Sequence, residues 1–147
     1  MLDKVDQKIT TALQQNARLA YKELASLVGL SAPAVAERVA RLQERGIIQG
    51  FHAHIDVFAC GYQLEAILLV RTAHQQLFAA IAAVKTMDEV ISCDTVTGEN
   101  CLVLRVAAHD IRHLDDISYR LLQFGETNTM VVKQQVVSNH LPSLQAH

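Results

Sequence analysis

The stretch that decides the fold runs from Tyr21 to Gly46 and reads YKELASLVGLSAPAVAERVARLQERG. It predicts a short helix, a tight turn at Gly29-Leu30-Ser31 and a longer second helix. Gly29 can adopt the left-handed conformation that ends a helix, and Ser31 can accept a backbone N–H as the N-cap of the next one. Pro33 is tolerated in a first turn, because the amides there have no partner within the helix. This arrangement is typical of a helix-turn-helix, whose second helix enters the DNA major groove.

The apolar residues of this stretch mark the faces that the two helices are expected to bury. One face of the first helix carries Leu24, Leu27 and Val28. A stripe along the second helix carries Val35, Val39 and Leu42, and off that stripe lie Ala34, Glu37, Arg38, Arg41 and Arg45. The same pattern also fits an ordinary helical hairpin in a core, because a fold does not fix a function. The rest of the chain has to separate the two interpretations.

The charges are unevenly distributed along the 147 residues. The net charge is −2, which argues against a chain that coats nucleic acid by bulk electrostatics. Residues 1–54 carry seven Lys and Arg against five Asp and Glu, a net of +2, whereas residues 55–147 carry six against ten, a net of −4. Any anionic partner is therefore expected at the N-terminal end.

The cysteines and the hydropathy of the chain predict a cytoplasmic protein. Cys60, Cys93 and Cys101 are odd in number and have no CxxC spacing, which favours a reduced setting over a disulfide framework. No apolar run reaches the ~18 residues of a membrane span, and charges at Asp3, Lys4 and Asp6 interrupt the start of the chain. Half of the residues are hydrophobic, which leaves ample material for cores and some for self-association.

The segments on either side of the helix pair complete a small N-terminal unit. A first helix is expected to begin at Asp3 as N-cap, with Asp6 forming an acidic version of a capping box. Its buried face is expected to hold Val5, Ile9, Ala12 and Leu13. After Gly46, alternating apolar residues from Ile47 to Ile55 predict a strand that serves as a wing or a connecting arm. Residues 56–61 are interpreted as a linker.

The second half alternates between strand and helix patterns, which makes the chain an α+β protein. Strands are expected at 64–72, 90–96, 101–108 and 127–137, and helices at 75–86 and 110–124. The order βαββαβ is that of a ferredoxin-like arrangement, with helices on one face of a sheet and the other face open. Because the strands are apolar on both alternations, as at Leu68 and Leu69, we expect face-to-face dimerisation to cover the open face.

The chain resembles the Lrp/AsnC family of feast/famine transcriptional regulators. The resemblance is carried in family order by Leu2-Asp3 with Asp6, Arg18, Glu23-Leu24-Ala25, Gly29-Leu30-Ser31, Arg38-Val39, Arg41-Leu42, Gly46-Ile47-Ile48, Gly61, Glu89-Val90 and Val96-Thr97-Gly98. It implies a winged helix-turn-helix at residues 1–48, a connecting strand and linker at 49–61, and a ferredoxin-like, ACT-like domain at 62–147. That second domain would bind an amino-acid effector at subunit interfaces and assemble homodimers into tetramers or octamers. Such a protein binds double-stranded DNA, and it is not an enzyme.

The sequence departs from the family pattern at three places. Ala20 stands where a capping serine is common, which predicts a helix cap weaker by about 1 kcal/mol. Val57 replaces a frequent proline in the linker. Asn100-Cys101 stands where the family often has an aromatic residue followed by Asp, and a neutral thiol cannot pair with the amino group of an effector. The identity of the effector therefore stays open.

Two sets of candidate site residues follow. For DNA binding they are Ser31, Ala34, Glu37, Arg38 and Arg41. Glu can accept from cytosine N4, Ala can contact a thymine methyl, and Arg can bind phosphate or guanine. Arg38 alternatively forms an ion pair with Glu37 or Glu23. For the effector the candidates are Thr97, Gly98, Glu99 and Asn100, whose turn can present backbone amides to a carboxylate, together with Gln134. A plain hairpin turn is the alternative there.

Other classes of protein fit the sequence less well. His52 and His54 share a strand face, and His109 and His113 lie four residues apart, but neither pair has evident third and fourth zinc ligands. We therefore expect no metal site and no cofactor. The six glycines form neither GxGxxG nor a P-loop, no GxSxG is present, and adjacent Asp115 and Asp116 point in different directions on a helix. The alternative function is a ligand-independent or metal-responsive DNA-binding regulator or architectural protein.

Overall fold

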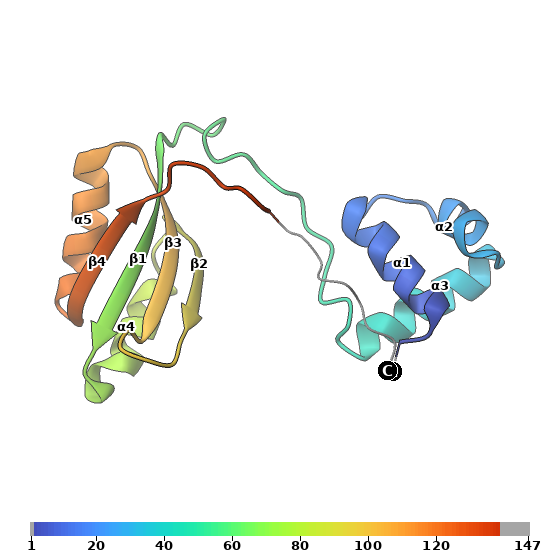
Figure 1. Ribbon diagram of the computed structural model, residues 1–147, viewed down its shortest axis with the longest axis horizontal. Coiled ribbons are helices and arrows are strands. Elements are labelled where there is room, and N and C mark those ends of the chain that lie inside the picture. The colour runs from blue at the N-terminus through green and yellow to red at the C-terminus, as the bar shows by residue number, and fades with distance from the viewer. Residues whose placement is uncertain (1, 139–147) are drawn as a thin grey trace. The chain divides into compact units, whose positions relative to one another are not determined.

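The computed structural model describes residues 2–138, which fold into two compact units (Figure 1). One unit is built from the residues up to His54, and the other comprises Ile55–Val136. None of the helices in the described residues has the length and apolar character needed to cross a membrane. Each unit has its own hydrophobic core.

The described residues of the first unit form three helices, α1 (Lys4–Gln15), α2 (Tyr21–Val28) and α3 (Ala32–Glu44). Asp3 caps α1 by accepting the backbone N–H groups of Val5 and Asp6, as the sequence predicts. Gly29 ends α2 in the left-handed conformation, with φ of 71°. The expected capping box at Asp6 is wrong, because the Asp6 carboxylate binds Arg38 instead.

Most of the predicted apolar faces form the core of this unit. Its buried members are Ile9, Leu13, Leu24, Ala25, Val35, Val39 and Leu42. Leu27 is an exception, since it is 60% exposed and Ala25 takes the inward position. At ~100° per residue, positions 24, 25 and 28 lie on one face of the helix, and position 27 lies outside that face.

The strand predicted from Ile47 to Ile55 is not formed. Gly46, with φ of 67°, ends α3, and the amides of Ile47 and Ile48 both donate to the Leu42 carbonyl. Residues 49–55 then run on without regular secondary structure. Within the described part of the chain this segment has no strand partner, and it runs as a connecting arm.

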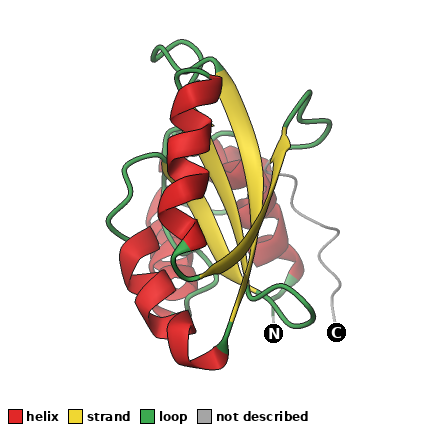
Figure 2. Ribbon diagram, turned by 90° about the vertical axis from the view of Figure 1, so that its left-hand side faces the viewer, coloured by secondary structure: helices red, strands yellow, loops and turns green. Residues whose placement is uncertain are grey.

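The second unit has the βαββαβ order that the sequence predicts. Its elements are β1 (Leu64–Thr72), the short helix η1 (His74–Gln76), α4 (Leu77–Val84), β2 (Val90–Thr95), β3 (Leu102–Ala108), α5 (Ile111–Leu122) and β4 (Gly125–Val131). The strands form one antiparallel sheet in the order β2-β3-β1-β4. The helices of this unit, α4 and α5, pack on one face of the sheet, and Figure 2 shows the sheet with its strands in yellow.

Alternate residues of the strands separate a helix-covered face from an open face. Leu68, Val70, Leu102, Leu104 and Val106 are fully buried, and they pack with Leu114, Ile117 and Leu121 of α5. Two other apolar residues of α5, Ile111 and Leu122, are 56% and 50% exposed. At about 100° per residue they lie roughly 60° and 80° from Leu114 around α5, on the side away from the buried Ile117 and Leu121.

The open face keeps an apolar centre. Ile67, Leu69 and Val103 are half-buried there, although the helices lie on the opposite side, and Met130 is 43% exposed. Glu65 and Arg105 form an ion pair of 2.6 Å on the same face. The last strand ends at Val131 rather than at 137, because its pairing with β1 stops at Ala66 and continues only through the amide of Val132 to the carbonyl of Glu65.

Candidate nucleic-acid interface and effector site

The helix α3 presents a polar row to solvent. Ser31 accepts the backbone N–H of Ala34 at 3.4 Å and so fixes the start of the helix. Glu37 and Arg41 are largely exposed, and their side chains approach to 3.9 Å, which is a weak i,i+4 pair. Ser31, Ala34, Glu37 and Arg41 therefore lie on one accessible side of α3, while Val35, Val39 and Leu42 hold the other side in the core.

Arg38 lies between these two sides and is bound within the unit. Its Nη1 contacts Asp3 Oδ2 at 2.6 Å and Asp6 Oδ1 at 2.7 Å. The sequence offers an ion pair as the alternative role of Arg38, and the structure contains one. Its partners are Asp3 and Asp6, however, and not the expected Glu37 or Glu23. The backbone N–H of Asp6 and the guanidinium of Arg38 hold the pKa of Asp3 below its ordinary value.

The start of α2 is capped from inside the helix. Ala20 has no side chain that can cap, which agrees with the expected poorer cap. The Glu23 carboxylate compensates in part by accepting the backbone N–H of Ala20 at 2.7 Å. Glu23 is thereby occupied at the helix terminus, which explains why it does not reach Arg38.

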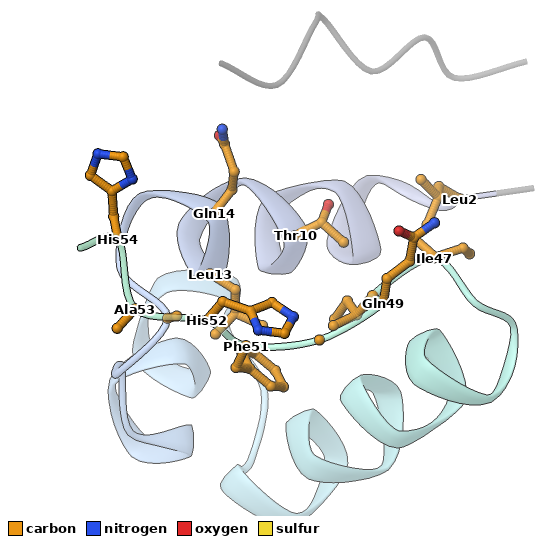
Figure 3. Close-up of a pocket in the computed structure, with 13 residues that line it drawn as sticks. Leu2, Thr10, Leu13, Gln14, Ile47, Gln49, Phe51, His52, Ala53 and His54 are labelled. Atoms are coloured by element: carbon orange, nitrogen blue, oxygen red, sulfur yellow. The ribbon is translucent and has the colours of Figure 1, made fainter. Parts of the chain in front are cut away.

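A cavity of about 490 Å³ lies between α1 and the arm that follows α3 (Figure 3). Leu13 and Phe51 supply apolar lining, and Thr10, Gln14 and Gln49 supply polar groups. His52 and His54, the first candidate metal pair, both line this cavity. Among the described residues, no three His, Cys, Asp or Glu side chains converge in a way that could hold a metal ion.

The effector candidates Thr97, Gly98, Glu99 and Asn100 form the turn between β2 and β3. Thr97, Gly98 and Glu99 are exposed, and Gly98 has a φ of 117° that favours glycine. Arg71 at the end of β1 donates to Glu99 at 3.0 Å and lies 3.9 Å from Glu126. The turn is thus a hairpin connection that also carries an exposed cluster of charges.

Cys101 anchors the end of this turn to β1. Its amide donates to the carbonyl of Val70 at 2.8 Å, and its thiol lies 3.4 Å from the carbonyl of Thr72. Both groups of Cys101 therefore contact the backbone of β1 and of the residue that ends it.

Gln134 does not join the other effector candidates within one chain. It follows the end of β4 and is exposed, so its predicted position on the last strand is wrong. β4 leaves the sheet beside Glu65 and Ala66, at the start of β1, whereas the Gly98 turn adjoins Val70 and Thr72, at its end. The two lie at opposite ends of the sheet.

The second histidine pair forms an aromatic stack rather than a chelate. The rings of Tyr62 and His109 stack at 4.4 Å, and those of His109 and His113 at 5.1 Å. His113 Nδ1 accepts the backbone N–H of His109 and its Nε2 lies 3.2 Å from Glu89. Both nitrogens of His113 are therefore occupied by the protein.

Sequence reasoning misses two sets of residues. It predicts only capping roles for Asp3 and Asp6, although an Asp on the core-facing side of α1 is a possible signal of a buried ion pair. It also places Arg71, which binds Glu99 in the turn between β2 and β3, within an apolar strand. A single arginine near the end of such a strand is the available signal.

The comparisons with known proteins agree with this architecture. Residues 2–43 match the AsnC-type helix-turn-helix domain, and residues 65–142 match the Lrp/AsnC ligand binding domain. The chain is 42% identical to HTH-type transcriptional regulator Rv2324 of Mycobacterium tuberculosis, over 78% of each protein. It is 34% identical to the leucine-responsive regulatory protein of Rhizobium meliloti, over 92% of this chain and 91% of that protein.

Solved structures give the same result over nearly the whole chain. A feast or famine regulatory protein from M. tuberculosis complexed with L-methionine superposes with a TM-score of 0.88 at 33% identity, covering 97% of this chain and all of that one. AsnC of E. coli superposes with a TM-score of 0.85 at 26% identity, covering 96% and 99%. These relatives are transcriptional regulators and not enzymes. The helix-turn-helix unit, the βαββαβ unit and these matches together place the chain in the Lrp/AsnC family of DNA-binding transcriptional regulators, with a ligand-binding domain as its second half.

Proposed function

We propose that the protein is a cytoplasmic transcriptional regulator whose binding to double-stranded DNA is modulated by an amino acid. The observation that carries the DNA-binding part is the row of exposed Ser31, Glu37 and Arg41, with half-buried Ala34 beside them, on one side of α3. This helix is capped at its start and packed along its other side. The N-terminal half of a recognition helix meets base edges in the major groove. Ala34 and Glu37 are therefore assigned to base contacts, and Arg41 to phosphate.

A salt titration of DNA binding tests the role of Arg41. Arg41→Ala is expected to weaken binding at every DNA sequence and to lower the slope of log affinity against log salt by about 0.9 for each phosphate that is no longer neutralised. Glu37→Gln is the matched control, because it changes a neighbouring exposed residue and is expected to alter sequence preference without flattening the slope. An Arg41→Ala protein with unchanged affinity across the titration would contradict the assignment.

The effector site is proposed at the turn of Thr97, Gly98, Glu99 and Asn100. Its support is the exposed glycine turn, whose amides can donate to a carboxylate, and the ligand-binding domain to which it belongs. A relative in the same family was solved with L-methionine, which makes an amino acid the proposed ligand class. Because Gln134 lies at the opposite end of the sheet, a site that uses Gln134 as well needs two copies of the chain.

Calorimetry with each of the twenty amino acids tests the effector. Binding of one or a few, weakened by Asn100→Ala, is the expected result. Glu126→Gln serves as the control, since Glu126 is exposed near Arg71 but lies outside the turn. Absence of heat with all twenty would favour a ligand-independent regulator.

Assembly is proposed to link the two halves. A ligand can shift the spacing of two DNA-binding units only by binding one arrangement of subunits more tightly than another. We propose a dimer formed through the open face of the sheet, with tetramers or octamers built from such dimers. Twofold symmetry then predicts DNA half-sites about one helical turn apart, or a multiple of that distance.

A further inference from the structure

The position of Arg38 on α3 differs from that of the other exposed residues of this helix. At about 100° per residue, Arg38 lies roughly 60° from Arg41 around the helix, toward the stripe of Val39 and Leu42. Its side chain is 24% exposed, against 57% for Arg41. Arg38 therefore lies at the edge where α3 meets α1, between the polar row and the core.

The contacts of Arg38 connect α3 to the start of α1. Asp3 uses one carboxylate oxygen to accept the amides of Val5 and Asp6, at 2.8 and 2.7 Å, and the other to bind Arg38 at 2.6 Å. Asp6 is buried, with a side chain only 11% exposed, and its oxygen binds the same guanidinium nitrogen at 2.7 Å. The capped first turn of α1 and the middle of α3 are thus joined through one side chain.

This geometry makes Arg38 a poor phosphate ligand, but it allows Arg38 to hold α3 against the start of α1. A guanidinium nitrogen shared by two carboxylates has its charge neutralised locally, and moving it to a phosphate would leave the buried Asp6 without its partner. Breaking such a pair is costly because a buried charge remains uncompensated. By contrast, holding Arg38 fixes the rotation of α3 about its axis, and with it the direction of Ala34, Glu37 and Arg41.

We propose that Arg38 does not contact DNA but is a positioning residue, which Asp3 and Asp6 hold so that the polar row of α3 meets base edges in one orientation. This inference rests on the proposed DNA-binding role of that row. It assigns to Asp6 and Arg38 a share of sequence discrimination, although neither touches the nucleic acid.

Positioning, phosphate binding and a merely structural role predict different changes in DNA binding. Removing a side chain that neutralises phosphate weakens binding to all sequences and lowers the salt slope by about 0.9 per phosphate. Removing a positioning side chain weakens binding to the preferred sequence alone, because non-specific binding does not depend on the alignment of base contacts. Removing a merely structural side chain changes the stability of the protein and leaves both kinds of binding unchanged once the protein is folded.

The test uses the full-length protein with two duplexes of equal length. One is selected in vitro from a random-sequence pool by the wild-type protein, and the other is an unrelated sequence. Arg38→Met, Asp6→Asn, the double variant and Arg41→Met as the matched control are titrated against both duplexes at several salt concentrations. Circular dichroism at the assay temperature establishes that each variant is folded.

Arg38→Met is expected to lose about tenfold in the ratio of specific to non-specific affinity, with an unchanged salt slope. Asp6→Asn is expected to lose a part of that factor, because Arg38 keeps its contact with Asp3. The double variant is expected to lose no more than Arg38→Met, which already breaks the pair with Asp6. Arg41→Met is expected to lower the slope. Asp6→Asn conserves side-chain volume and carries the test if Arg38→Met does not fold.

Three results distinguish the possible failures. A lower salt slope for Arg38→Met, with both duplexes weakened equally, would mean that Arg38 binds phosphate, and it would overturn the inference. An unchanged specificity ratio in folded Arg38→Met and Asp6→Asn would also overturn it, in favour of a structural role. A wild-type protein that selects no sequence and binds neither duplex would refute the proposed function itself.

Discussion

Glu89 connects the loop before β2 to α5 in the second unit. Its Oε1 accepts from Arg120 at 2.6 Å and lies 3.2 Å from His113 Nε2, while its side chain is only 15% exposed. Burial opposes ionisation, but hydrogen bonds from its own backbone N–H, Arg120 and His113 outweigh that effect and hold the pKa of Glu89 below its ordinary 4.5. Glu89 therefore stabilises the unit as a carboxylate.

Replacing Glu89 by Gln is expected to lower the free energy of unfolding by about 1–3 kcal/mol at neutral pH, since charge-assisted hydrogen bonds are removed. Because the folded-state pKa lies below the unfolded one, the wild-type advantage is present in full above about pH 4.5 and disappears as the pH falls through the folded-state pKa. Urea unfolding of both proteins from pH 7 to pH 3 measures this difference in the free energy of unfolding. Glu126→Gln, at an exposed site, should leave the curve unchanged, and a constant difference down to pH 3 would contradict the prediction.

At the scale of helices and strands, local chemistry is enough to predict most of the fold. Gly29 and Ser31 mark the turn between α2 and α3, and the capping role of Asp3 is confirmed. These signals act within a few residues, so a sequence carries them directly. The alternation of strand and helix patterns likewise predicts the βαββαβ order, with the end of β4 as the main error.

The predictions that are wrong depend on contacts between residues far apart in the sequence, or on a neighbouring strand that is absent from the described residues. The segment from Ile47 to Ile55 has the alternation of a strand, but a strand forms only when its backbone groups are paired. Arg38 belongs to α3 by sequence, and its carboxylate partners lie 32 and 35 positions away. The sequence pattern places Gln134 on the last strand, and only the register of β4 against β1 shows that it lies beyond the sheet.

Gly125 is a position at which the close approach of a neighbouring strand requires glycine. It opens β4 opposite Thr72, and a Cβ atom there would lie 2.0 Å from the carbonyl oxygen of Arg71. We expect Gly125→Ala to destabilise the protein by about 1–3 kcal/mol, the usual cost of overpacking. The urea midpoint measures the destabilisation.

Gly50→Ala is the matched control for that substitution. The added Cβ would meet only the far end of the His52 side chain, which can move. Its midpoint is expected to stay close to that of the wild type. Equal midpoints for Gly125→Ala and the wild type would show that β1 and β4 can separate at this end without cost.

At the scale of the whole molecule, the low net charge of the DNA-binding unit supports the proposal that two copies bind DNA together. Residues 1–54 carry a net charge of only +2, and non-specific binding to DNA grows with the number of phosphates neutralised. Two units joined in a dimer bind as a pair, because the second binding event becomes intramolecular. The open face of the sheet, with Ile67, Leu69 and Val103 at its apolar centre, is the surface proposed to join them.

Leu69→Lys is expected to separate this dimer, since it places a charge opposite Val103 and beside Asn128 at the centre of the open face. Sedimentation should show monomers with unchanged circular dichroism, and affinity for a two-half-site duplex should fall to that for a single half-site. Leu122→Lys is the control, because Leu122 is 50% exposed on α5, on the helix side of the sheet. If Leu69→Lys sediments like the wild type while Leu122→Lys dissociates, the helices and not the open face of the sheet join the two copies.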